Sequence, residues 1–391
     1  MFDIPAIFYK FKNPMRQKKG VFKSMRILAF NWRDTKNPLA GGAEEYLFNI
    51  LSLIANEKNK ITYFTASFPG SNPIENGENY TIIRKGSRFT VYFHAALFYI
   101  KNRKKYDIVI DSINTVPFFT PLYVGKKKRI AIIHHIGEWE TIRKELPVIP
   151  AIVAYMASKL ALFLYKNTRI ITVSNSTKDE LISKDINEKH ISIVWNGLKM
   201  VNNHYSKRVK KAGVPTVVYI GRVKLSKNLD HLIHAFKIVK AKIKEAELVI
   251  GGKGDEECYH YLKGIAEKEN ISNVHLLGML SEEDKRKYME SGWVFVYPST
   301  KEGWGLSVIE ANACGTPAVG YDVSGLKESI QNGKTGFLAK KNNINELADR
   351  IIIILENREL REELEKNAMK WAGNFSYEKS AEEFYKIFKS I

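Results

Sequence analysis

Charged and polar side chains that could bind a ligand gather where predicted apolar strands end. In the segment PSTKEGWGLSVIEANAC, Glu302 lies just past a predicted strand, and Glu310 follows about two helical turns later. Gly303 and Gly305 allow tight backbone, and a helix is predicted from Leu306. The unpaired N–H groups at a helix start suit a diphosphate or a sugar hydroxyl. Two carboxylates framing that start predict a site for a sugar on one side and a ribose diol on the other.

Two basic side chains follow another predicted strand, in the segment GRVKLSKN. Arg222 leaves the strand end and Lys227 lies five residues later on the loop. Two fixed cations there can clamp a diphosphate and stabilise it as it departs. An Arg/Lys pair on a loop is by itself more often plain surface charge, so this interpretation depends on the neighbouring motifs.

Three weaker motifs also end predicted strands. GGAEEY places Gly41 and Gly42 before a helix, where backbone can approach a phosphate or a sugar. IIHHIG places His134 and His135 at a strand end, although a histidine in such a run is usually structural. GGKGD, with Gly252, follows another strand; its preferred interpretation is a turn, and its second interpretation is a loop next to a bound phosphate.

The elements that must position these residues alternate between short apolar strands and helical-period segments. The alternation starts at Met25, and it restarts with a strand over Thr216–Ile220 after a basic, turn-rich stretch. This pattern predicts an α/β fold of two doubly wound, Rossmann-like domains facing a cleft, with ligands beyond the carboxyl ends of the strands. The predicted parts are a basic extension (1–24), an N-terminal Rossmann-like domain (25–204), a C-terminal Rossmann-like domain (205–372) and a C-terminal helix (373–391).

One segment, Leu146–Tyr165, is unusually apolar. Only 15 residues follow Pro150, and Lys159 interrupts them, so a transmembrane helix is disfavoured. A core helix and a helix that contacts a membrane or an acceptor lipid both fit the pattern.

Composition narrows the function classes. The chain has 391 residues, 61 Lys and Arg against 42 Asp and Glu, and a formal charge of +19. Residues 1–200 hold 31 basic and 16 acidic side chains, which predicts an anionic partner for that half. Two cysteines, Cys258 and Cys314, cannot build a disulfide framework and favour a reducing, cytoplasmic location. The first 24 residues do not have the charge order of a secretory signal.

Taken together and in this order, the motifs resemble those of the retaining glycosyltransferases of the GT-B fold, the group 1 or GT4-like family. The resemblance runs from Met25 to the C-terminal segment FSYEKSAEEFY. It implies a GT-B architecture in which the N-terminal domain (25–204) is the acceptor domain, the C-terminal domain (205–372) is the nucleotide-sugar domain, and the C-terminal helix (373–391) crosses back. It also implies transfer of a hexose from a UDP- or GDP-linked donor with retention. The implied acceptor is a glycan or a lipid-linked glycan. No cofactor is implied beyond the donor itself, and no metal, since no Asp-x-Asp motif is present.

The resemblance also implies roles. Glu302 would contact the transferred sugar, Glu310 the nucleotide ribose, and Arg222 with Lys227 the diphosphate. The histidine that meets the donor sugar maps onto His134, with His135 as the alternative. The remaining donor-binding positions would be Gly41, Gly42, Gly303, Trp304 (where many relatives carry Phe), Gly305 and Leu306, with Gly252 as a further candidate.

Two other readings compete with this one. A nucleotide-sugar epimerase or phosphorylase could use the same architecture, and a non-enzymatic binder of nucleic acid or lipid could use the charge. The lysine runs at 101–105 and 126–129 lack the interleaved aromatics of a nucleic-acid surface, which disfavours a nucleic-acid partner. We therefore expect a peripheral enzyme at the anionic inner face of the membrane.

Overall fold

The computed structural model describes residues 24–114, 116–137, 139, 142–143, 146–198 and 211–391. The predicted basic extension up to residue 23 and the predicted domain boundary at 204 and 205 lie outside these residues. The described chain forms two compact units. The first runs to Ser112 and includes Phe118–Ala131 and Tyr377–Ile391, and the second comprises Ile113–Pro117 and Ile132–Ser376.

The first Rossmann-like domain is built on a sheet whose described strands have the order β3-β4-β2-β1-β5-β6-β7-β8. The pairs β1–β2, β1–β5, β2–β4 and β7–β8 are parallel, and the short β3 pairs antiparallel with β4. The strands are β1 Met25–Phe30, β2 Asn59–Thr65, β3 Ile74–Asn76, β4 Tyr80–Arg84, β5 Ile108–Ile113, β6 Arg129–Ile133, β7 Arg169–Thr172 and β8 Ile191–Ile193. The helices are α1 Gly42–Ile54, α2 Val91–Asn102, α4 Val148–Leu164 and α5 Asn175–Ile182, with short 3-10 turns η2 Arg103–Lys105 and η4 Lys126–Lys128.

The second Rossmann-like domain has a sheet of order β11-β10-β9-β12-β13-β14, in which every described pair is parallel. Its strands are β9 Thr216–Ile220, β10 Glu247–Gly251, β11 Val274–Leu276, β12 Val294–Tyr297, β13 Ala318–Tyr321 and β14 Gly336–Ala339. Its helices are α6 Leu229–Lys242, α7 Glu256–Lys268, α8 Glu282–Ser291, α9 Leu306–Ala313, α10 Leu326–Ser329, α11 Ile344–Glu356 and α12 Arg358–Ala372, with the 3-10 turn η7 Leu225–Lys227.

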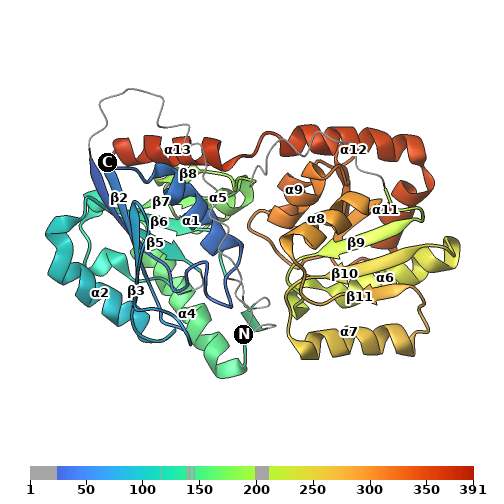
Figure 1. Cartoon of the computed structure of the whole chain (residues 1–391), viewed down its shortest axis with the longest axis horizontal. Coiled ribbons are helices and arrows are strands. Elements are labelled where there is room, and N and C mark those ends of the chain that lie inside the picture. The colour runs from blue at the N-terminus through green and yellow to red at the C-terminus, as the bar shows by residue number, and fades with distance from the viewer. Residues whose placement is uncertain (1–23, 115, 138, 140–141, 144–145, 199–210) are drawn as a thin grey trace. The chain divides into compact units, whose positions relative to one another are not determined.

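The predicted α/β fold class is confirmed. Central strands such as β9 and β12 are buried on both faces, which explains why they read as unbroken apolar runs. The C-terminal helix α13 (Tyr377–Lys389) packs back onto α1, where the Phe384 and Tyr46 rings lie 5.8 Å apart (Figure 1). The predicted return of the chain's end to the N-terminal domain is therefore also confirmed.

The apolar segment after Pro147 forms the helix α4. Its buried side is lined by small residues, among them Ala151, Ala154 and Ser158. Its large side chains point outward, and Ile149 and Phe163 are 76% and 68% exposed. Helix α4 is therefore a surface helix with one buried side rather than a fully buried core helix, and its contact with a membrane or an acceptor lipid stays a prediction. Among the described residues, no helix combines the length and the apolar character needed to cross a bilayer.

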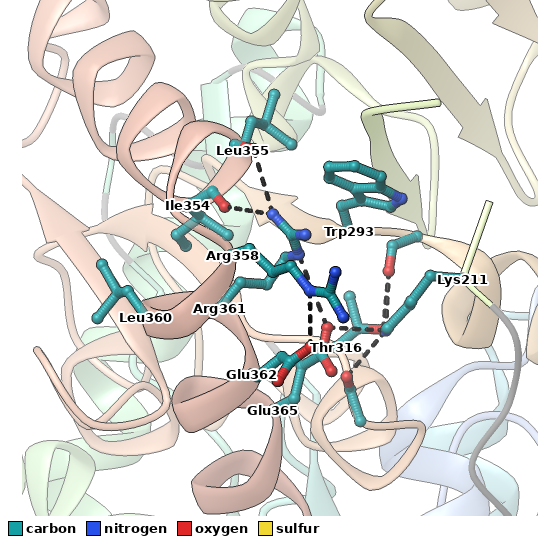
Figure 2. Close-up of polar contacts among 12 residues, drawn as sticks. Lys211, Trp293, Thr316, Ile354, Leu355, Arg358, Leu360, Arg361, Glu362 and Glu365 are labelled. Carbon is teal, nitrogen blue, oxygen red and sulfur yellow. Dashed lines mark hydrogen bonds and ion pairs between the residues drawn. The ribbon is translucent and has the colours of Figure 1, made fainter. Parts of the chain in front are cut away.

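A half-buried cation, Lys211, fixes the chain where the second domain begins. The Lys211 Nζ atom donates hydrogen bonds of 2.9 Å to the Gly292 and Gly315 carbonyls and of 2.8 Å to the Thr316 hydroxyl (Figure 2). The Trp293 indole donates to the next carbonyl, that of Ala212, at 2.9 Å. Burial lowers the pKa of Lys211 to about 8. The first residues described after the turn-rich stretch are therefore held rigidly against β12 and β13.

Candidate active site

The basic motif and the acidic motif meet at the carboxyl ends of β9 and β12. Lys227 donates a hydrogen bond from Nζ to Glu302 Oε1, and the two side chains are only 16% and 15% exposed. The ammonium also lies 5.3 Å from the centre of the Tyr297 ring. Asn228, in the left-handed conformation with φ +47°, donates from Nδ2 to the Pro298 carbonyl at 3.1 Å. The two loops are thus bound together, and two of the proposed catalytic side chains contact each other directly.

Close backbone packing fixes the loop that carries Arg222. Gly252 has φ +132°, and a Cβ added there would lie 1.9 Å from the Gly221 carbonyl oxygen. Val223 N–H donates to the Lys253 carbonyl at 2.8 Å. Gly252 therefore has a turn-forming role that only glycine can fill. These contacts hold the end of β9. The half-buried Arg222 follows that end, on the sheet edge that also carries Lys227 and Glu302.

The backbone of the Glu302 loop is held by glycines as well. The Glu302 N–H donates to the Ser324 carbonyl at 3.1 Å, and a Cβ on Gly325 would lie 2.6 Å from the Glu302 carbonyl. Gly305, with φ +87°, is the N-cap of α9, which begins at Leu306 as predicted. The helix start is therefore adjacent to the candidate sugar-binding carboxylate.

Glu310, on α9, has a partner that sequence reasoning missed. Lys285 on α8 donates from Nζ to Glu310 Oε1 at 3.0 Å, and its distance to Oε2 is 2.9 Å. Both side chains are about one quarter exposed. The pair joins residues 25 positions apart on separate helices, so no local spacing could have indicated it.

The two adjacent histidines occupy different environments. His134 follows β6 and is buried, whereas His135 is exposed. Burial lowers the pKa of His134 to about 3, and the neighbouring His135 adds to the shift. The His134 carbonyl accepts a hydrogen bond of 3.1 Å from the Thr177 hydroxyl, and a Cβ on Gly303 would lie 2.4 Å from it. His134 is thus held as a neutral imidazole close to the Glu302 loop.

Trp304 is buried in an aromatic cluster. Its ring lies 5.0 Å from that of Phe375 and 6.4 Å from that of Trp195, and only 3% of the residue is exposed. The indole therefore stiffens the loop between Gly303 and Gly305.

The early glycine pair, in the first unit, precedes α1. Gly41 is the helix N-cap, and its N–H donates at 2.8 Å to Oε2 of the buried Glu44. The Arg33 guanidinium binds the other oxygen of Glu44 at 3.0 Å. Gly42 begins the helix. Glu44, the fourth residue of the GGAEEY motif, is therefore a positioning residue that holds the glycine turn and Arg33 together.

Two carboxylate contacts tie α5 to the loops around the site. The Glu328 carboxylate accepts hydrogen bonds from the N–H groups of Asn175 and Ser176, from the Asn175 amide and from the Ser176 hydroxyl. Lys301, next to Glu302 in the chain, binds both oxygens of Glu180 on the same helix at 2.7 and 2.9 Å. The helix that holds the His134 carbonyl is therefore also bonded to the Glu302 loop.

Comparison with known proteins agrees with this architecture. Residues 202–371 match the family model described as glycosyl transferases group 1, and residues 40–200 match that of glycosyltransferase family 4. Together these two models span most of the chain, which belongs to the group 1, GT4-like glycosyltransferases.

Individual relatives match over shorter spans. The chain is 32% identical to an uncharacterised glycosyltransferase of Methanocaldococcus jannaschii, over 59% of this chain and 62% of that protein. It is 30% identical, over 45% of each chain, to the N,N'-diacetylbacillosaminyl-diphospho-undecaprenol alpha-1,3-N-acetylgalactosaminyltransferase of Campylobacter jejuni. The matched spans thus cover less than two thirds of these relatives.

Solved structures share the fold. Sucrose-phosphate synthase from Thermosynechococcus elongatus superposes with a TM-score of 0.75 at 19% identity, over 94% of this chain and 98% of that one. HepE of Anabaena, solved with UDP and glucose, gives 0.70 at 16% identity, over 94% of this chain and 100% of that one. The prediction of a GT-B fold is therefore confirmed.

Proposed function

We propose that this protein is a retaining hexosyltransferase that uses a UDP- or GDP-linked sugar and requires no metal ion. The observation that supports this most is the contact between Lys227 and Glu302 at the strand ends, with Arg222 on the same edge. That arrangement offers a carboxylate for sugar hydroxyls and two cations for a diphosphate. HepE, of the same fold, was solved with UDP and glucose.

The reaction follows from where charge develops. As the bond from the anomeric carbon to the diphosphate oxygen breaks, negative charge grows on the leaving phosphate. Arg222 and Lys227 stabilise that charge. The acceptor hydroxyl attacks the same face of the anomeric carbon, and its proton passes to a phosphate oxygen of the leaving diphosphate. Glu302 orients the sugar through its hydroxyls, and the neutral His134 can exchange a hydrogen bond with the sugar without changing charge.

We propose that the donor's ribose binds at Glu310. Two hydroxyls of a ribose match the two oxygens of one carboxylate. In the ligand-free arrangement the Lys285 ammonium contacts both of these oxygens. Binding of the donor would therefore replace or share this ion pair, which makes Lys285 part of the donor site.

The acceptor we propose is a glycan or lipid-linked glycan, taken up at an anionic membrane surface on the cytoplasmic side. The Campylobacter relative is named for an acceptor that carries diphospho-undecaprenol. Residues 1–200 carry most of the net charge of +19, and α4 exposes large apolar side chains. Cys258 and Cys314 are both free thiols, in keeping with a reducing compartment.

A panel of UDP- and GDP-hexoses tests the donor class. The protein should release nucleoside diphosphate from one donor, and the anomeric configuration of the product, read by NMR, should equal that of the donor. Glu302→Ala should lose more than about 90% of the rate, a barrier change above about 1.4 kcal/mol. Glu267→Ala, at an exposed glutamate of α7, should behave as wild type.

The metal requirement is tested separately. Activity should survive EDTA, and Arg222→Ala with Lys227→Ala should abolish it. Loss of turnover in EDTA and its recovery with magnesium would show that a metal neutralises the diphosphate. Formation of a new nucleotide sugar without an acceptor would identify an epimerase instead.

A further inference from the structure

Helix α2, in the first unit, presents large apolar side chains to solvent along one stripe. Phe89, Phe93, Leu97 and Ile100 are 75%, 65%, 40% and 51% exposed. Phe89 lies in the turn just before α2, and the spacing of four and three residues places Phe93, Leu97 and Ile100 on one face of the helix. The opposite side of α2 buries Val91, Ala95 and Tyr99 in the core of the domain.

Basic side chains surround this stripe. The 3-10 turn η2 directly continues α2, and η4 lies against it, because Lys128 Nζ donates to the Tyr106 carbonyl at 2.7 Å. The rings of Tyr99 and Tyr123 lie 5.9 Å apart and join the same two segments. With the stripe, the exposed cations make up what we call the α2 surface: Arg88, Lys101, Arg103, Lys104, Lys105, Lys126 and Lys127.

Acidic side chains are missing from the segments that form this surface. Residues 79–106 and 112–137 contain no Asp or Glu, while they hold seven and four Lys or Arg. The Arg88 guanidinium lies 4.8 Å from the centre of the exposed Phe89 ring. An apolar stripe edged by a cluster of exposed cations fits a partner that is apolar inside and anionic at its surface.

We infer that the α2 surface binds the headgroup region of an anionic lipid bilayer, with the apolar stripe inserted and the cations on lipid phosphates. A second copy of this chain is a poor occupant, since it would bring an equal set of cations against the first. Nucleic acid is also disfavoured, because Leu97 and Ile100 have no ring to stack on a base. The inference deepens the proposed function by assigning a site to its membrane surface, but binding itself needs no catalysis.

Vesicle sedimentation of the full chain tests this assignment. The probes are vesicles of phosphatidylcholine alone and vesicles that contain about one third phosphatidylglycerol. We expect binding only to the anionic vesicles, and at least a tenfold loss of binding between 50 mM and 500 mM salt, because the Debye length shortens from about 14 Å to about 4 Å.

Two pairs of variants locate the contact. Phe89→Ser with Phe93→Ser should reduce binding at least tenfold, whereas Tyr261→Ser with Met279→Ser, at exposed positions of the second unit, should not. Lys104→Glu with Lys105→Glu should abolish binding, whereas Lys244→Glu with Lys334→Glu, which changes the charge equally, should reduce it less than threefold. Circular dichroism confirms that each variant is folded.

Each alternative outcome overturns the assignment. Equal binding to neutral vesicles, no binding at low salt, or equal loss in test and control variants would reject the α2 surface as a lipid site. Vesicle binding that is absent, together with self-association that the Phe89 and Phe93 changes abolish, would identify a protein interface. Glu302→Ala should bind vesicles as wild type does, so a failed glycosyltransferase proposal and a failed lipid assignment remain distinguishable.

Discussion

Replacing Glu328 by Gln tests whether the hydrogen bonds between Glu328 on α10 and the N-terminus of α5 contribute to catalysis. The carboxylate accepts four hydrogen bonds at the N-terminus of α5, two on each oxygen. In Gln one oxygen becomes an NH₂ group, which donates and cannot accept. Two of the four hydrogen bonds are therefore lost, together with the negative charge that the helix N-terminus attracts.

The size of the effect follows from these contacts. A hydrogen bond to a charged group contributes about 1.5–3 kcal/mol, and the low end applies here because the contacts with Asn175 are exposed. The helix N-terminus adds about 0.5–1 kcal/mol. The interaction free energy between Glu328 and the N-terminus of α5 should therefore fall by about 3–4 kcal/mol. Lys301 still binds Glu180, so part of the arrangement survives, and we expect kcat to fall by about 10- to 100-fold.

Steady-state kinetics of donor turnover measures this. Because Glu310 and Lys285 are untouched, the KM for the donor should change less than about twofold, so the loss should appear in kcat. Glu346→Gln is the matched control, since Glu346 accepts a backbone hydrogen bond from Lys340 near the start of α11, away from the site. If Glu328→Gln keeps kcat within about threefold of wild type, or loses activity only in proportion to a fall in Tm that the control shares, Glu328 has a structural role alone.

Three further predictions follow from single contacts. His134 has a pKa of about 3 in the folded protein and about 6.5 in the unfolded chain, so between these pH values only the unfolded chain binds the proton. The free energy of unfolding, measured by denaturant titration, should therefore fall by about 2–3 kcal/mol from pH 7 to pH 4.5. His134→Gln should remove this pH dependence. Lys285→Met should remove the ammonium that competes with the donor's ribose for Glu310, and lower the donor KM by up to about threefold with kcat unchanged. A raised KM would contradict this. Gly252→Ala should destabilise the fold by more than about 3 kcal/mol in a denaturant titration, because the added Cβ would overlap the Gly221 carbonyl. The control Gly264→Ala, in open space on α7, should stabilise the fold by about 0.5–1 kcal/mol in the same titration.

Much of the fold was predictable because parallel strands are buried on both faces. Thr216–Ile220 and Ala318–Tyr321 stand out as apolar runs, and the structure has strands at those bounds. The helix Val91–Asn102 is not predicted by the sequence pattern. Its apolar residues surround the helix and therefore lack helical periodicity, since some face the core and others face solvent.

For the candidate site, the sequence predicts which motifs lie at strand ends but not which of their side chains contact each other. Local spacing places Glu302 before a helix and Arg222 after a strand, because loop position follows from element order. It could not predict that Lys227 binds Glu302, since this pair spans 75 residues and depends on which strands are neighbours in the sheet.

Sequence separation also explains why the positioning residues were missed. Catalytic motifs are compact because tight backbone and a helix start must be adjacent in the chain to form one ligand contact. The side chains that orient them have no such constraint: Glu328 lies 153 residues from Asn175, and Lys301 lies 121 residues from Glu180. A residue that supports a site through tertiary packing leaves no local pattern. The positioning residues, such as Glu328, are therefore identified only by the structure, and mutation of these residues is the direct test of their role.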